Sequence, residues 1–193
     1  KAEKRSMDVK AKKLRREGFV TGNLFGREIE GSIPLKFTKK EIEVLLKNNN
    51  KGSQVMLELD GKTYDALIKE VDYNPLAHTV EEVDFQALVS NEMVHSTAEI
   101  ILENEEKVMS GVLQDELKEV AYKALPADLV DKIKVDVAGM KIGDTLRVKD
   151  LEIAKNKNIH ITTDLEAVIA TVTPVHNVVP ETETEAEETA EEK

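Results

Sequence analysis

Residues 55–68 read VMLELDGKTYDALI, and this stretch predicts a tight β-hairpin. Polar and apolar side chains alternate on both sides of Asp60-Gly61, as they do in strands with one buried face. An Asp-Gly pair favours the two-residue turn that joins adjacent antiparallel strands. The side chains expected to face inward are Val55, Leu57, Leu59, Tyr64, Ala66 and Ile68.

The rest of the chain is also rich in short strands. They are predicted at residues 29–37, 80–88, 94–102, 120–125, 133–137, 145–148 and 167–172. Pro34 indicates an edge position for the first of these, because proline cannot donate a hydrogen bond to a neighbouring strand. A short helical turn is expected at Pro126-Ala127-Asp128. The regular spacing of short strands in the second half favours a small barrel or sandwich.

Two helices are predicted between the strands of the first half. Thr38 and Glu41 have the spacing of a capping box, which predicts that a helix begins there and ends at the asparagines from Asn48 onward. Residues 6–17 predict a shorter helix that ends at Gly18, a residue suited to the left-handed cap. The fold class is therefore mainly β with short helices.

Composition changes mark the expected domains. The polar residues Ser90-Asn91-Glu92 separate two β-rich units, which we place at residues 1–91 and 92–178. Residues 181–193 carry seven glutamates, one lysine and no large apolar residue. Such a segment buries too little apolar surface to offset the entropy of ordering, so residues 179–193 are predicted to be a disordered acidic tail.

Several classes of function find no support in the residues. The chain has no cysteine, which excludes disulfides and thiolate chemistry and indicates a reducing compartment. Its four histidines lack the i, i+3 or i, i+4 partners of a helical metal site. No apolar run approaches the length of a membrane span, and no phosphate-binding glycine loop or nucleophile elbow is present. We therefore expect a soluble cytoplasmic protein that is not an enzyme and uses no cofactor, metal, membrane or small-molecule substrate.

The charge is unevenly distributed. Residues 1–90 hold 16 Lys and Arg against 15 Asp and Glu, whereas residues 91–193 hold 11 against 23. Within the first half, the strongest basic cluster comprises Lys10, Lys12, Lys13, Arg15 and Arg16. Helical spacing brings such cations together, where they can contact phosphates. A solvated helix face and a nuclear-import signal are the alternatives that the sequence leaves open.

Short motifs in the same order and spacing resemble the bacterial large-subunit ribosomal protein number 25 family. In the first half they are Ala2-Glu3-Lys4-Arg5, Lys12-Lys13-Leu14-Arg15-Arg16-Glu17-Gly18, Leu24-Phe25-Gly26 and Val83-Asp84-Phe85-Gln86. The second half resembles the carboxyl-terminal domain of the family's long form, the general stress protein Ctc. Its matching segments are residues 111–114, 125–128, 135–137, 142–144 and 148–151.

The resemblance implies an amino-terminal β-barrel that binds the loop E region of 5S rRNA in the central protuberance, with a second β domain beside it and neighbouring ribosomal proteins as partners. The resemblance places Lys12, Arg15, Phe25 and Asp84 at the RNA. Together with the rest of the basic cluster and the residues beside these positions, the predicted RNA-binding residues are Arg5, Lys10, Lys12, Lys13, Arg15, Arg16, Phe25, Glu82 and Asp84. Phe25 stands where the family usually has tyrosine, and Glu82 stands where histidine is common. Asp84 could accept hydrogen bonds from base amino groups while the cations screen phosphates. A stress-linked, ribosome-associated interaction module with weak RNA affinity is the alternative function.

Overall fold

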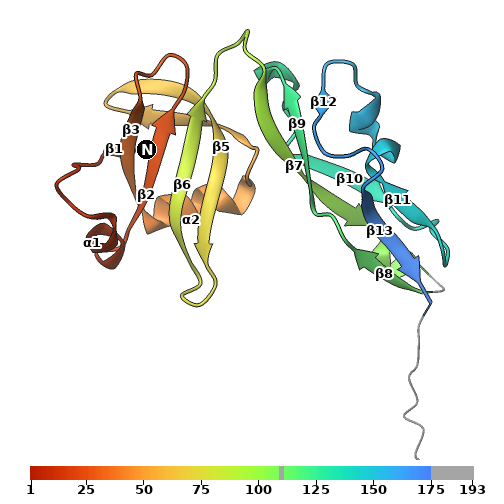
Figure 1. Ribbon diagram of the computed structural model, residues 1–193. Coiled ribbons are helices and arrows are strands. Elements are labelled where there is room, and N and C mark those ends of the chain that lie inside the picture. Colours follow the sequence, from red (N-terminus) through yellow and green to blue (C-terminus); the bar gives the residue numbers. More distant parts are fainter. Residues whose placement is uncertain (109–110, 175–193) are drawn as a thin grey trace, which may run out of the picture.

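The computed structural model describes residues 1–108 and 111–174 (Figure 1). The predicted acidic tail at residues 179–193 lies outside these residues. In the described part, strands β1 to β6 form one sheet in the order β1-β3-β2-β6-β5-β4. Their bounds are β1 Glu3–Lys4, β2 Phe19–Phe25, β3 Ser32–Thr38, β4 Gln54–Leu59, β5 Lys62–Asn74 and β6 Thr79–Ala87.

The two ends of this sheet meet. Ala2, next to β1, forms a parallel bridge with Leu59 of β4, and its N–H donates to the carbonyl of Glu58 at 2.8 Å. This contact joins the first strand in the sheet order to the last. The amino-terminal sheet therefore curls into a barrel, which confirms the expected architecture.

The barrel interior follows the alternation that the sequence displays. On β6, Val83 and Phe85 are fully buried, and the Phe85 ring lies 5.5 Å from that of Phe37, centroid to centroid. The hairpin of β4 and β5 pairs Leu57 with Tyr64 and Leu59 with Lys62, as the Asp60-Gly61 turn predicts. The predicted hairpin is confirmed.

Helix α2, Lys39–Asn48, begins with the predicted capping box. The Glu41 N–H donates to Thr38 Oγ1 at 3.3 Å, and the Thr38 N–H donates to a Glu41 carboxylate oxygen at 3.0 Å. Ile42 is the fully buried residue of this helix. The apolar face of α2 thus packs on the barrel.

Helix α1, Ala11–Arg16, is shorter than predicted. Residues 6–10 form a turn instead, because the Ser6 hydroxyl accepts from the Asp8 N–H at 3.3 Å and donates to the Asp8 carboxylate at 2.9 Å. Such local side-chain bonds compete with helical ones. Gly18 follows the helix at φ 91°, which is the predicted left-handed conformation.

Two other expectations about the first half were incomplete or wrong. Strand β2 was not predicted, because Thr21-Gly22-Asn23 interrupts its apolar alternation. Strand β3 is not at the edge, since β1 pairs with Leu35 and Lys36. Pro34 is tolerated there because the strand needs only its carbonyl, which accepts from the Arg5 N–H at 2.9 Å.

The second half forms two further sheets, ordered β10-β7-β9-β12 and β11-β13-β8. The strands are β7 Val94–Glu103, β8 Val112–Asp115, β9 Glu119–Ala124, β10 Lys132–Asp136, β11 Thr145–Arg147, β12 His160–Ile161 and β13 Val168–Thr173. Short 3₁₀ turns lie at Glu105–Lys107, Pro126–Asp128, Val148–Asp150 and Glu152–Lys155. The strands predicted in this half are confirmed, with β8 and β12 in addition. Both sheets contribute to one apolar cluster that includes Tyr122 and Ile169.

The loop between α2 and β4 contacts the second half. Ser53 Oγ donates to the Asp131 carboxylate at 3.1 Å, and Lys51 Nζ lies 3.3 Å from the Glu119 carboxylate. Gly52 adopts φ 90°, and a Cβ there would lie 1.9 Å from the carbonyl oxygen of Thr97. We propose that the domain boundary lies at residues 91 and 92, between β6 and β7.

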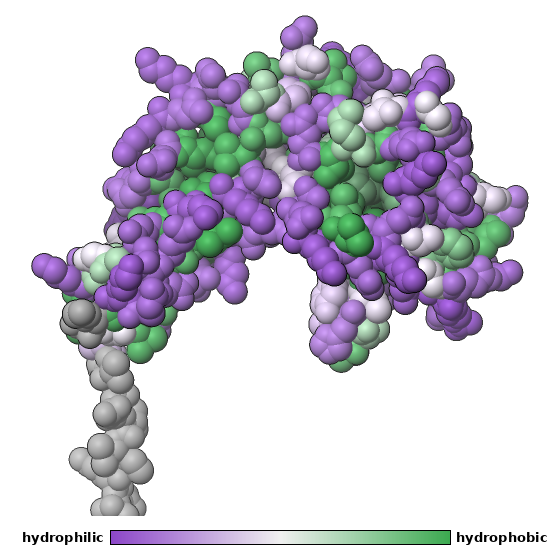
Figure 2. Space-filling view, turned by 180° about the vertical axis from the view of Figure 1, so that it is seen from behind, coloured by the Kyte–Doolittle hydropathy of each residue, from purple (hydrophilic) through white to green (hydrophobic). Residues whose placement is uncertain are grey.

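Hydrophilic side chains cover most of the face seen in Figure 2, with smaller apolar areas between them. Within residues 1–108 and 111–174, no helix is long and apolar enough to cross a membrane.

Candidate nucleic-acid interface

Helix α1 carries most of the predicted basic cluster. Leu14 is buried and anchors the helix, while Lys10, Lys12, Lys13 and Arg16 are exposed. Lys13 Nζ lies 3.8 Å from the Glu17 carboxylate. Among the described residues, Lys10, Lys12 and Arg16 form no ion pair at all. The helix therefore presents cations that are free to bind an anion.

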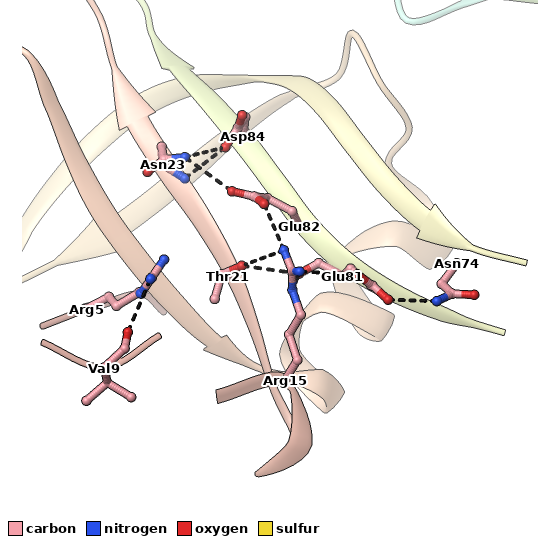
Figure 3. A network of polar contacts seen from close by, with 9 residues as sticks. All are labelled: Arg5, Val9, Arg15, Thr21, Asn23, Asn74, Glu81, Glu82 and Asp84. Atoms are coloured by element: carbon pink, nitrogen blue, oxygen red, sulfur yellow. Dashed lines mark hydrogen bonds and ion pairs between the residues drawn. The ribbon is translucent and has the colours of Figure 1, made fainter. Parts of the chain in front are cut away.

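Arg15 differs from its neighbours because it points back to the barrel (Figure 3). Its guanidinium donates to Glu82 Oε2 at 2.9 Å, to Thr21 Oγ1 at 3.3 Å and to the carbonyl of Glu81 at 3.1 Å. A further ion pair joins it to the Glu81 carboxylate at 3.2 Å. The Arg15 side chain is 30% exposed. Arg15 thus ties α1 to β2 and β6 and neutralises carboxylate charge.

Glu82 and Asp84 lie beside each other on the outer face of β6. The parallel pairing of β2 and β6 places Thr21 opposite Glu82. Asn23, the next outward residue of β2, donates its N–H and its side-chain amide to Asp84 Oδ1 at 3.0 and 3.1 Å. The same amide lies 3.4 Å from Glu82 Oε1. These bonds fix the orientation of both carboxylates.

The remaining predicted site residues lie apart from this network. Arg5 donates to the Val9 carbonyl at 3.2 Å, and its Nε is buried with no hydrogen-bond partner among the described residues. Phe25 is half-buried at the end of β2, where it pairs with Ser32 on one side and Gln86 on the other. The structure brings together Arg15, Glu82 and Asp84, with the exposed α1 cations nearby, and leaves Arg5 and Phe25 separate.

The sequence did not indicate Thr21, Asn23 and Glu81 as part of the site. Thr21 and Asn23 belong to the strand that was not predicted, and only its pairing with β6 brings them to the carboxylates. Glu81 enters through its ion pair with Arg15 and through its carbonyl, which accepts from Arg15 Nε at 3.1 Å and from Thr21 Oγ1 at 3.4 Å. The sequence signal that could have identified this face is the alternation of polar Thr21 and Asn23 with Val20, Gly22 and Leu24, which becomes a strand pattern once Gly22 is counted as an inward position.

Further carboxylates extend the outer face onto β5. Glu70 pairs with Asp84 and Asp72 pairs with Glu82 across the β5–β6 ladder. Within the described residues, no group of His, Asp or Glu has the arrangement of a metal site. The negative charge of this face repels phosphate groups, in contrast to the cations of α1.

The chain was compared with known proteins. The Ribosomal L25p family model matches residues 1–85, and the model for the C-terminal domain of ribosomal protein TL5 matches residues 93–176. Relatives named large ribosomal subunit protein bL25 include one from Carboxydothermus hydrogenoformans, 32% identical over 94% of this chain and 94% of the relative. Another, from Dictyoglomus thermophilum, is 30% identical over 93% of this chain and 89% of the relative. This chain therefore belongs to the large ribosomal subunit protein bL25 family, in its long two-domain form.

Proposed function

We propose that this chain binds 5S rRNA, at its loop E region, in the central protuberance of the large ribosomal subunit. The coarser function follows from its family: the chain is a structural, non-enzymatic component of the large subunit, with a ribosome-associated cytoplasmic location. The observation that carries the finer proposal is the exposed cationic surface of α1, where Lys12 and Arg16 form no ion pair with any described residue, beside fixed hydrogen-bond acceptors.

The cations of α1 suit an RNA backbone. Lys12 and Arg16 are four residues apart in the helix, so both project from one face. Lys10 and Lys13 flank them. Lys10, Lys12 and Arg16 are unpaired in the described part of the chain, so binding phosphate does not require them to break an existing ion pair.

The acceptors beside α1 suit base edges. Asn23 occupies Asp84 Oδ1, and no hydrogen bond of the described residues occupies Oδ2. An A-form RNA helix exposes base edges and 2′-hydroxyls in a wide, shallow minor groove, and guanine presents its amino group there. Asp84 Oδ2 is therefore available to accept from a base amino group.

Arg15 makes this arrangement compatible with RNA. Glu82 alone would repel a phosphate, but its carboxylate is bound by Arg15 at 2.9 Å. The ion pair lowers the negative potential beside α1. We propose that Arg15 acts as a positioning residue, while Lys10, Lys12, Lys13 and Arg16 contact phosphates.

A salt titration of binding to 5S rRNA tests the proposal. Four phosphate contacts give a log–log slope of affinity against salt of roughly −3 to −3.6. The double variant Lys12→Gln/Arg16→Gln should reduce the magnitude of this slope by about 1.5 to 2. The variant Lys40→Gln/Lys62→Gln is the matched control, because it removes two exposed cations elsewhere on the barrel and should leave the slope unchanged.

Absence of binding by the purified wild-type protein to its own organism's 5S rRNA at low salt would overturn the proposal. Equal slopes for the α1 variant and its control would show that another surface contacts the phosphates.

A further inference from the structure

The outer face of β7 and β9 carries acidic residues at one end and basic residues at the other. At one end Glu99 lies opposite Glu119, and at the other His95 lies opposite Lys123. His160 of β12 continues the second end, because it pairs with Lys123 on the other side. Residues directly opposite in antiparallel strands point to the same face. His95, Lys123 and His160 therefore form a basic row across three strands.

The acidic end of this face is covered by polar contacts, whereas the basic row is open. Asn50 donates to the Glu99 carboxylate, and Lys51 lies 3.3 Å from that of Glu119. Both partners come from the loop that joins α2 to β4. The three residues of the basic row are exposed, and within residues 1–108 and 111–174 none of them is ion-paired. An uncompensated basic row in a chain of net charge −11 calls for an anionic partner.

A groove of about 290 Å³ runs beside the basic row, between β5 and β7. Lys51, Lys69 and His95 contribute to its lining, together with one carboxylate, that of Glu70. Lys69 Nζ donates to the His95 carbonyl at 2.7 Å, which holds its charge at the groove. Burial and the neighbouring cations lower the pKa values of both Lys69 and His95. A bound anion would relieve this repulsion.

We propose that the basic row and the adjoining groove bind the phosphate backbone of a second rRNA segment, distinct from the one at α1. The inference rests on the proposed function only in requiring that the chain binds rRNA. Neighbouring strands are about 4.8 Å apart, so the row spans roughly 10 Å and can reach more than one phosphate. The row itself consists of exposed polar side chains, without the Trp, Tyr, Phe or large aliphatic residues that anchor a protein partner. Leu67 and Ile68 line the groove, but both are fully buried. RNA therefore fits this surface better than a protein does.

A generic RNA duplex serves as the probe for this surface. The variant Lys123→Gln/His160→Gln of the full chain should reduce the magnitude of the salt slope by roughly 0.7 to 0.9, the contribution of the one lysine that it removes. The matched control is Lys62→Gln/His78→Gln, which removes the same residue types from the barrel and should leave the slope unchanged. Since Lys62, His78, Lys123 and His160 are all exposed, both variants should melt like the wild type.

Histidine ring signals in NMR spectra give a second, local readout. On addition of the duplex, the rings of His95 and His160 should shift, whereas the ring of His78, which contacts the Tyr73 hydroxyl on the barrel, should not. Repeating the titration with Lys12→Gln/Arg16→Gln isolates the basic row, because that variant leaves it intact. Suppose that the ring signals shift in this variant but the wild type does not bind 5S rRNA. This result would overturn the proposed function and support the inference that the basic row binds RNA.

Two results would overturn the inference about the basic row. One is that the protein binds 5S rRNA, but the His95 and His160 ring signals stay unchanged on addition of either 5S rRNA or the generic RNA duplex. The other is a shift of these signals on addition of purified large-subunit proteins and not of RNA, which would assign the surface to a protein partner.

Discussion

At the scale of single residues, adjacent arginines in one helix have different environments. Arg15 is 30% exposed and binds Glu81, Glu82 and Thr21, whereas Arg16 is exposed and unpaired among the described residues. Hydrogen bonds to charged groups contribute more to stability than neutral ones, and partial burial reduces screening by water. Arg15 should therefore matter for the folded state and Arg16 for binding.

Replacing each arginine with glutamine separates these roles. Arg15→Gln should lower the free energy of unfolding by about 1–2 kcal/mol, because it leaves Glu81 and Glu82 without their cation. Arg16→Gln should change it by less than about 0.5 kcal/mol but reduce the salt slope of 5S rRNA binding by about 1. Urea denaturation and the binding titration measure both quantities. Equal losses of stability in the two variants would contradict the assignment.

At the scale of elements, α2 shows how a local motif fixes a helix start. Thr38 and Glu41 satisfy each other's backbone N–H groups, which the first turn would otherwise leave unpaired. The Thr38 hydroxyl and then its N–H lower the pKa of Glu41, since both favour the ionised carboxylate. The capping box is thus coupled to the protonation state of Glu41.

The variant Thr38→Ala should lower the free energy of unfolding by about 1 kcal/mol at neutral pH. Because the pKa of Glu41 is lower in the folded state, the stabilisation is present above the carboxyl's ordinary pKa and is lost as the pH falls through the lowered one. The difference between wild type and variant should shrink over that acidic range. Urea denaturation at a series of pH values measures it, with Ser90→Ala, at an exposed loop position, as the control. A difference that grows on acidification would contradict the coupling.

At the scale of the whole molecule, the contact between the two β units depends on close backbone approach. Gly52 combines φ 90° with a position where a Cβ would lie 1.9 Å from the Thr97 carbonyl oxygen. Around it, Ser53 binds Asp131 and Lys51 binds Glu119. These contacts set the groove beside the basic row, and Gly52 itself contributes to the lining of that groove.

The variant Gly52→Ala should displace the loop from β7 and weaken the contact between the units. We expect faster proteolysis between residues 88 and 93 and a lower melting temperature. Gly61→Ala is the matched control, because Gly61 also has a positive φ, 76°, but no atom lies within 4 Å of the added Cβ. The Gly61→Ala variant therefore has the backbone strain of a positive φ but no steric clash of the added Cβ. Equal proteolysis of the two variants would show that Gly52 does not hold the units together.

The sequence by itself determined most local features: the Asp60-Gly61 hairpin, the capping box of α2 and the basic character of α1. Each depends on periodicity or on residues within a few positions of one another. It also carried the resemblance to the family that the comparisons show. Only the tertiary structure decided which cation of α1 binds Glu82, because Arg15 and Glu82 are 67 residues apart in the chain. The basic row likewise exists only through the pairing of β7, β9 and β12. Strand register sets which distant charges become neighbours, and no local pattern encodes it.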